Sequence, residues 1–201
     1  AKLDLEAIDI PETVQRNVAA LFEPAGRGVA MLGFTAEGGL LTFTFRGDLH
    51  ASRRLEITLD QLLNADTEQR QALFDRIVLE LQRSIDAFEH QHHHVSLAKL
   101  MVMPLPEEIG LAAYLGQNLY VAVEAADLGS VMDLIKVPEL RNPGRQAQCF
   151  HLLGAALRFL HDHILLNKLI CLIARDLERA VGFFLRLRHH TIPLGNHLLR
   201  L

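Results

Sequence analysis

The sequence predicts an α/β fold built on a mixed five-stranded sheet, with a helical extension at its C-terminal end. One long amphipathic helix, expected over residues 67–94, has apolar residues at three- and four-residue spacing and polar residues elsewhere. Three closely spaced strands precede this helix, and two apolar strands that alternate with helices follow it. A helix with one apolar stripe must cover a sheet, and both flanks supply the strands for one.

The composition is that of a globular protein with enough apolar material for one core. The chain has 201 residues, of which 50% are hydrophobic and 22% are charged, and its formal net charge is −4. It lacks the basic excess of nucleic-acid binders, and no apolar run reaches the roughly 18 residues of a membrane span. Cys149 and Cys171 lie in apolar helical patterns and are expected to be reduced, as in a cytoplasmic protein.

The N-terminal part of the chain predicts a strand, a helix and then a meander of antiparallel strands. Alternating apolar and charged residues predict the first strand, and Pro11 opens the helix, which ends at Phe22. Two glycine-containing turns then separate three strands, the last of which is polar enough to lie at an edge. The first strand is expected over residues 3–10, and the meander over residues 29–34, 40–45 and 49–57.

The later elements alternate between helices and strands that are apolar on both faces, as parallel strands are. This order of elements is that of the ribonuclease-H-like fold, which is also one half of the actin-like ATPase fold. Strands are expected over residues 97–105 and 120–125, helices over residues 107–119 and 146–160, and short turns over residues 59–63 and 128–134.

Several runs of sequence carry a resemblance to a known family. The most distinctive are LELQRS, over residues 79–84, and GAALR, over residues 154–158; VAMLGF, GGLLTFTFRGDLHASRRLEI and LYVAVEAADLGSVMDL add to them. Over residues 3–158 the chain resembles the mannose-sensitive haemagglutinin (MSHA) pilus biogenesis family called MshI. That family is similar to the PilM-type actin-like proteins of type IV pilus systems and, more distantly, to the actin-like module of the type II secretion L protein.

The resemblance implies an organisation, a location and partners. Residues 1–26 would be a strand-helix segment that ends a first actin-like half absent from this sequence, residues 27–160 a ribonuclease-H-like subdomain, and residues 161–201 a helical tail. The family implies a cytoplasmic scaffold, peripheral to the bacterial inner membrane, that docks inner-membrane pilus platform proteins. The assembly ATPase is a further implied partner, and no nucleic-acid partner is expected.

The resemblance also locates where a nucleotide would bind in an actin-like ATPase. The superfamily's phosphate hairpin has an Asp at the end of a strand, followed by Gly and small hydroxylic residues. Here the equivalent residues are Gly33, Thr35, Gly38 and Gly39, and Glu37 adds negative charge near any phosphate. The turn that would hold adenosine, residues 103–108, has no Gly and two carboxylates.

We therefore expect a degenerate nucleotide site and a chain that is not an enzyme and binds no cofactor. The alternative is a nucleotide-binding actin-like ATPase fragment whose missing first half completes the site. A ribonuclease-H-type nuclease would need several carboxylates at strand ends for two metal ions. Leu49, Ala51 and Met101 stand at such positions, which argues against that activity.

Four histidines at the end of the long helix are the weak candidates for a metal site. Imidazoles are common ligands of Zn²⁺ and Ni²⁺. Histidines also interact favourably with the C-terminal end of a helix dipole, and we favour this polar-cap interpretation over a metal site. The residues are His90, His92, His93 and His94.

The tail carries an apolar stripe at spacings of three and four residues, which predicts an amphipathic helix. Such a stripe can pack on the chain's own sheet, on a second copy of the chain, or on a membrane surface. We favour a contribution to self-association, because a ribonuclease-H-like core already has helices for both faces of its sheet. The stripe consists of Leu166, Ile170, Ile173, Leu177, Ala180 and Phe184.

Overall fold

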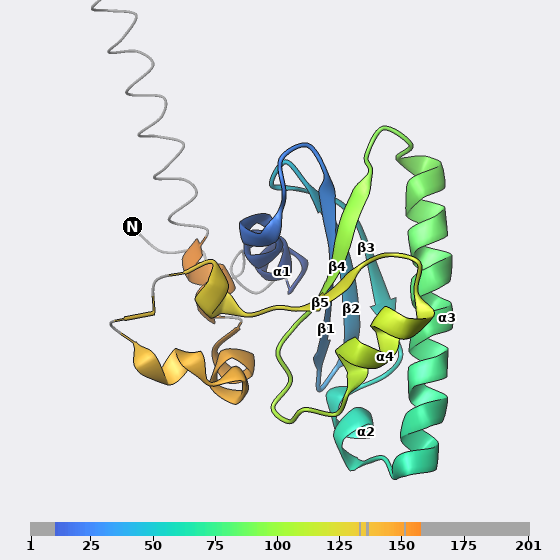
Figure 1. Cartoon of the computed structure of the whole chain (residues 1–201), viewed down its shortest axis with the longest axis vertical. Helices are drawn as coiled ribbons and strands as arrows, with labels where there is room; N and C mark the ends of the chain where they lie inside the picture. The colour runs from blue at the N-terminus through green and yellow to red at the C-terminus, as the bar shows by residue number, and fades with distance from the viewer. Residues whose placement is uncertain (1–10, 133, 136, 151, 158–201) are drawn as a thin grey trace, which may run out of the picture. The chain divides into compact units, whose positions relative to one another are not determined.

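The computed structural model describes residues 11–132, 134–135, 137–150 and 152–157 (Figure 1). The chain divides into two compact units, residues 1–158 and 159–201, and every described element belongs to the first unit. The strand predicted over residues 3–10 and the predicted helical tail lie outside the described residues.

A mixed sheet of five strands, in the order β3-β2-β1-β4-β5, forms the centre of this unit. The first three strands pair in antiparallel fashion, whereas β4 pairs with β1, and β5 with β4, in parallel. The predicted meander followed by parallel strands is confirmed, and so is the edge position of β3. The strands are β1 (Gly28–Thr35), β2 (Gly38–Phe45), β3 (Asp48–Leu55), β4 (Leu97–Val102) and β5 (Val123–Ala125).

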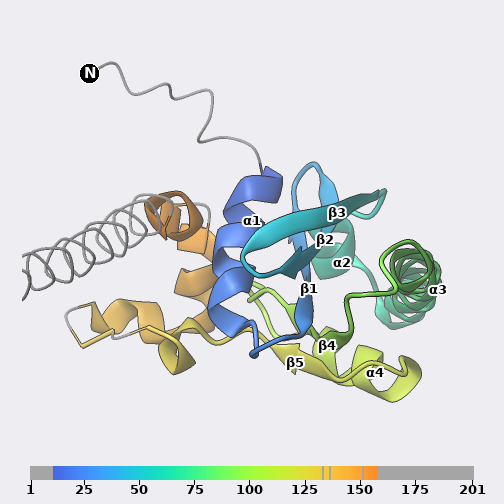
Figure 2. The same ribbon diagram turned by 90° about the horizontal axis from the view of Figure 1, so that it is seen from above.

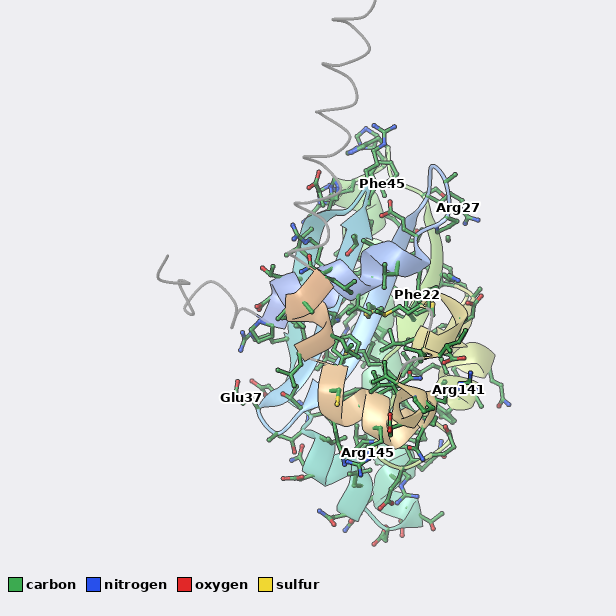
Figure 3. The ribbon with its side chains drawn as sticks, turned by 90° about the vertical axis from the view of Figure 1, so that its left-hand side faces the viewer. Phe22, Arg27, Glu37, Phe45, Arg141 and Arg145 are labelled. Atoms are coloured by element: carbon green, nitrogen blue, oxygen red, sulfur yellow. The ribbon has the colours of Figure 1, made fainter. Side chains whose placement is uncertain are left out.

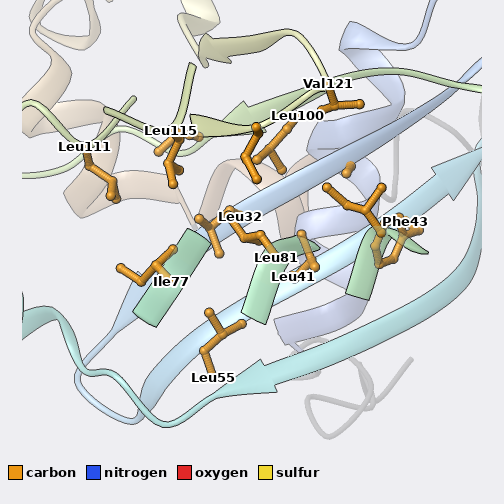
Figure 4. Packing of buried hydrophobic residues seen from close by; sticks show 14 of the residues in the cluster. Leu32, Leu41, Phe43, Leu55, Ile77, Leu81, Leu100, Leu111, Leu115 and Val121 are labelled. Atoms are coloured by element: carbon orange, nitrogen blue, oxygen red, sulfur yellow. The ribbon is translucent and has the colours of Figure 1, made fainter. Parts of the chain in front are cut away.

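One face of the sheet is covered by α2 (Leu59–Asn64), the long helix α3 (Thr67–Gln91) and α4 (Leu111–Asn118), as Figure 2 shows from above. Both α2 and α3 begin with a capping box, formed in α3 by Asp66 and Gln69, so orphan N–H groups at their N-termini are satisfied. The buried stripe of α3 packs on the strands (Figure 4), and its members are Phe74, Ile77, Leu81, Ile85 and Phe88.

The other face is covered by α1 (Pro11–Ala19), the 3-10 turn η2 (Ala20–Phe22) and a helix over residues 143–150 and 152–157. This face has its own smaller core, in which Val18, Met31 and Phe150 are at most 1% exposed. Polar side chains are buried here as well, because Thr42 and Thr44 of β2 face α1 rather than solvent. The loop between β5 and the last helix contains the 3-10 turns η3 (Leu128–Ser130) and η4 (Pro138–Arg141).

Two predicted elements are longer than the observed ones. The long helix ends at Gln91, not at residue 94, because the backbone of His92 leaves the helical region and Val95 N donates to His92 O in a turn. The strand predicted over residues 97–105 ends at Val102, because Pro104 has no N–H group to continue the ladder.

Three further predictions about the second half of the chain need correction. The helix predicted from residue 107 begins at Leu111, after Gly110 in the left-handed region at φ 79°. The strand predicted over residues 120–125 is a short edge strand that is half-buried to exposed. The last helix begins at residue 143, with a proline in its first turn, and its Ala156 is exposed instead of facing the core.

Candidate interaction site

The β1–β2 hairpin occupies the position of the predicted phosphate hairpin, and its polar groups are used within the turn itself. Thr35 Oγ1 donates to Gly38 O and accepts from Glu37 N, both at 3.2 Å. Gly38 lies at φ 141°, and a Cβ there would stand 2.8 Å from Leu55 O of β3. The glycines of this hairpin are therefore explained by the turn and by the close approach of β3.

The space above Gly33 is filled by two side chains from distant parts of the chain. A Cβ on Gly33 would stand 2.1 Å from Met103 Sδ and 3.2 Å from Gln15 Oε1. Gly33, Gln15 and Met103 are all buried. The acidic side chain that the resemblance leads one to look for at this strand end therefore has no room here unless Met103 moves away.

The turn after β4 borders a groove at the carboxyl ends of β4 and β5, with about 1170 Å³ of space including open solvent. Two carboxylates at this groove accept hydrogen bonds from backbone N–H groups two residues away. Glu108 Oε1 accepts from Gly110 N at 2.9 Å, and Asp127 Oδ1 accepts from Gly129 N at 2.8 Å. Arg141, in η4, supplies a positive charge at this groove and is labelled in Figure 3.

One buried amide holds the loop beside this groove. Gln146 is 1% exposed, and its Oε1 accepts from Leu128 N at 3.1 Å. Its Nε2 donates to Leu140 O at 2.8 Å and to Asp127 Oδ1 at 3.2 Å. The side chain thus ties the last helix to both 3-10 turns, so the groove has a fixed wall.

Three of the four candidate histidines lie together, and they are joined by one that the sequence did not single out. The rings of His92 and His94 are 6.1 Å apart between centroids, and the His50 ring of β3 lies 5.6 Å from His92 and 6.5 Å from His94. His93 contacts His94 at 6.0 Å. Within the described residues, however, no three His, Cys, Asp or Glu side chains are arranged to hold a metal ion.

The other candidate residues divide between those that the structure describes and those that it does not. Gly33, Thr35, Gly38 and Gly39 lie together at the hairpin between β1 and β2. The stripe that begins at Leu166 lies outside the described residues. Sequence reasoning missed Gln15, because nothing in the pattern of α1 distinguishes a buried glutamine from one on its solvent face.

None of the described helices is both long enough and apolar enough to cross a membrane. No family model matches the sequence, and no curated protein matches it. Among solved structures, a chain of the PilM-PilN type IV pilus biogenesis complex is similar, with a TM-score of 0.55 and 22% sequence identity. The match covers 74% of this chain and 51% of that one, so the chain spans about half the length of its structural neighbour.

A second similarity is to the ethanolamine utilization protein EutJ from Carboxydothermus hydrogenoformans, with 11% identity over 55% of this chain and 48% of that one. Its TM-score of 0.38 is too low to support an argument. The likeness to the pilus biogenesis complex shows the fold, and together with the strand order it confirms the ribonuclease-H-like, actin-like class.

Proposed function

We propose that this chain is a non-catalytic scaffold module in the biogenesis of a type IV pilus of the MSHA type. In this proposal it lies at the cytoplasmic face of the bacterial inner membrane and docks the short cytoplasmic tails of platform proteins. The shared fold with a chain of the PilM-PilN complex supports a place in pilus assembly, although a fold alone does not define a function.

The observation that carries the non-catalytic part is the filled space above Gly33. A nucleotide's phosphates need backbone amides, cations or a metal ion to bind, and this strand end offers Met103 Sδ and Gln15 Oε1 instead. Glu37 at the same hairpin adds a charge of the wrong sign. These features favour a module whose role is binding proteins over one that hydrolyses ATP.

The proposed partners are suggested by the structural neighbour, a complex of PilM with PilN. For this chain we propose inner-membrane platform proteins as partners, and the assembly ATPase as a further one. We also propose self-association of the chain through an apolar stripe in its C-terminal tail. The residues are Leu166, Ile170, Ile173, Leu177 and Phe184, and they lie outside the described part of the chain.

The alternative function is nucleotide binding by an actin-like ATPase of which this chain is one part. The groove at the ends of β4 and β5 favours it, because ligands of open α/β sheets bind beyond the carboxyl ends of parallel strands. Arg141 at that groove would suit a phosphate. The hairpin argues against this alternative, and we therefore rank it second.

The scaffold proposal is tested by titrating the chain into fluorescently labelled peptides that copy the cytoplasmic tails of pilus platform proteins. We expect saturable binding that is unchanged by Mg²⁺ and ATP, whereas peptides of scrambled sequence should not bind. If no tail peptide binds, or if binding requires the nucleotide, the proposal is wrong.

A further inference from the structure

A hollow of about 510 Å³, counted with its open mouth, lies beside the β1–β2 hairpin, where Figure 3 labels Glu37. Gln15 and Gly33 line it, and Arg54 and Glu37 are its charged residues. The rest of the lining is mostly apolar and comes from both ends of the described chain. These apolar residues include Pro11, Leu40, Leu55, Met103 and Phe150.

The side-chain amide of Gln15 has only one possible orientation. Its Nε2 donates to Met31 O at 2.5 Å and to Leu40 O at 3.0 Å. Because a backbone carbonyl only accepts hydrogen bonds, the amide nitrogen must face these two atoms. Thr42 Oγ1, at 3.2 Å from the same nitrogen, adds a third contact. The amide oxygen must therefore face the other way.

That oxygen is an acceptor at the wall of the hollow. Gln15 Oε1 lies 3.2 Å from the point where a Cβ on Gly33 would stand, and both residues line the hollow. In the described part of the chain no group donates a hydrogen bond to it. Among the described residues, two buried side-chain atoms are sealed from solvent and have no hydrogen-bond partner, namely Thr44 Oγ1 and Arg70 Nε. The Gln15 oxygen is not one of them.

An acceptor to which no protein group donates is satisfied only when water or a ligand donates to it. A ligand for this hollow therefore needs an apolar body and one O–H or N–H group at its tip. An anion is disfavoured, because the Gln15 oxygen and the Glu37 carboxylate both repel negative charge, and the Arg54 guanidinium already pairs with Glu12 Oε1 at 3.1 Å. An aromatic body is favoured, because the Met103 thioether and the Phe150 ring both make good contacts with a ring.

We infer that this hollow binds the phenol ring of a tyrosine presented by a partner polypeptide, with the tyrosine O–H donating to Gln15 Oε1. The inference rests on the proposed function only in taking the ligand from a polypeptide. The geometry of the hollow stands without it, and the tail peptides used to test the scaffold proposal need not use this hollow. The two proposals can therefore fail separately.

The experiment is a titration of the intact chain labelled with ¹³C at its methionine methyl groups. The probes are p-cresol and toluene, which copy the side chains of tyrosine and phenylalanine, and indole, which copies tryptophan. The chain has four methionines, and replacement of Met103 by Leu assigns its signal. We expect p-cresol to shift the Met103 methyl signal and to bind on the order of tenfold more tightly than toluene, since toluene leaves the Gln15 oxygen without a donor.

A second set of titrations tests whether the phenol can come from a tyrosine residue and whether Gln15 recognises its O–H group. N-acetyl-tyrosinamide should shift the same Met103 signal, because its side chain enters while its backbone stays outside. In Gln15→Met the preference for p-cresol over toluene should fall to about one, whereas Arg54→Ala should keep the wild-type preference.

Several outcomes overturn the inference, and those measured on the wild-type chain do not depend on whether a variant folds. They are an unchanged Met103 signal, equal affinity for p-cresol and toluene, and tighter binding of indole than of p-cresol. If p-cresol binds and N-acetyl-tyrosinamide does not, the hollow takes a small phenol, and the assignment to a partner's tyrosine is wrong.

Discussion

The two faces of the sheet are built on different principles. The face under α3 is a large apolar core in which the residues at helical spacing pack on the strands, and the rings of Phe43 and Phe88 stack at 4.3 Å. The face under α1 is smaller, buries Gln15, Asn17 and Thr42, and depends on two close approaches at glycines. We infer that the α3 face supplies most of the stability, whereas the α1 face carries the candidate site at Gly33.

The close approaches show how the α1 face is specified. A Cβ on Gly154 would stand 2.5 Å from Val14 Cγ1 and 2.7 Å from Val14 O, so the last helix touches α1 through its backbone. Asn17 Nδ2 donates to Gly154 O at 2.9 Å across the same contact. Shape and hydrogen bonds fix this face, whereas apolar area dominates the other.

The largest expected effect comes from emptying the α3 face. Phe74→Ala should lower the free energy of unfolding by about 3–5 kcal/mol, and Leu81→Ala by about 2–5 kcal/mol, because each removes a buried side chain and leaves a cavity. Urea unfolding followed by circular dichroism measures the loss. Leu79→Ala on the same helix is the matched control. Leu79 is 46% exposed, so its truncation should change the stability by less than about 0.5 kcal/mol.

Equal losses for Leu79→Ala and Leu81→Ala would mean that α3 does not present the described stripe to the sheet. Thermally silent Phe74→Ala and Leu81→Ala variants would contradict the packing of this helix altogether.

A smaller loss is expected on the α1 face. Gly154→Ala should cost about 1–3 kcal/mol, because the new methyl group meets the backbone of Val14, which cannot rotate away. Gly116→Ala in α4 is the control. Gly116 is exposed, and the nearest atom to a Cβ there is 3.9 Å away, so the gain in helix propensity should raise the stability by about 0.5–1 kcal/mol. The two substitutions should therefore change the stability in opposite directions. Stabilisation by both would show that α1 and the last helix do not touch.

Removing the cap of α3 should have an effect of about 1 kcal/mol. Asp66 Oδ1 accepts from Gln69 N at 2.8 Å, and Asp66→Ala leaves that N–H group without its partner. Asp66→Ser keeps an acceptor and should retain most of the stability. If the two variants are equally stable in thermal unfolding, the capping box contributes nothing.

The smallest expected effect on stability appears only at alkaline pH, and it comes from the tyrosines that contact α3. Both tyrosines of the chain donate to carboxylates of α3, Tyr114 to Asp75 and Tyr120 to Asp86. The hydrogen bond to Asp75 raises the pKa of Tyr114, and partial burial together with the charge of Glu89 raises the pKa of Tyr120, which is 61% exposed. Since both values lie above those of the unfolded chain, this stabilisation is present below about pH 10 and is lost as the pH rises through the raised pKa values.

Absorbance at 295 nm during an alkaline titration measures these ionisations. The folded chain should ionise its tyrosines at higher pH than the chain in concentrated urea. In Tyr120→Phe the remaining transition should report Tyr114 alone. Superimposed titration curves for the folded and unfolded chain would show that the tyrosines do not interact with α3.

The sequence predicted the α3 face well, because that face depends on local patterns. The stripe from Phe74 to Phe88 follows helical periodicity, and Asp66 was among the caps that its residue type allows. The errors arose where single residues override a pattern. Helix α4 begins only after Gly110, β4 ends before Pro104, and α3 ends before His92.

The candidate site was predicted only in part, for a physical reason. The composition of the hairpin showed that Gly33 stands where an acidic residue was sought. That Met103 and Gln15 fill the space above Gly33 depends on contacts between α1, β1 and the end of β4. Such long-range packing leaves no periodic signal in the sequence, and neither does the ring contact of His50 with His92.

The central claim of the proposed function is that the strand end at Gly33 belongs to an interaction surface and does not bind a nucleotide. Isothermal titration of the chain with ATP and Mg²⁺, at high micromolar nucleotide, tests it most directly. We predict a flat titration, because the atoms above Gly33, Met103 Sδ and Gln15 Oε1, donate no hydrogen bond to a phosphate, and Glu37 repels it. A saturable heat that substitutions between residues 33 and 39 abolish would contradict the claim and favour the ATPase.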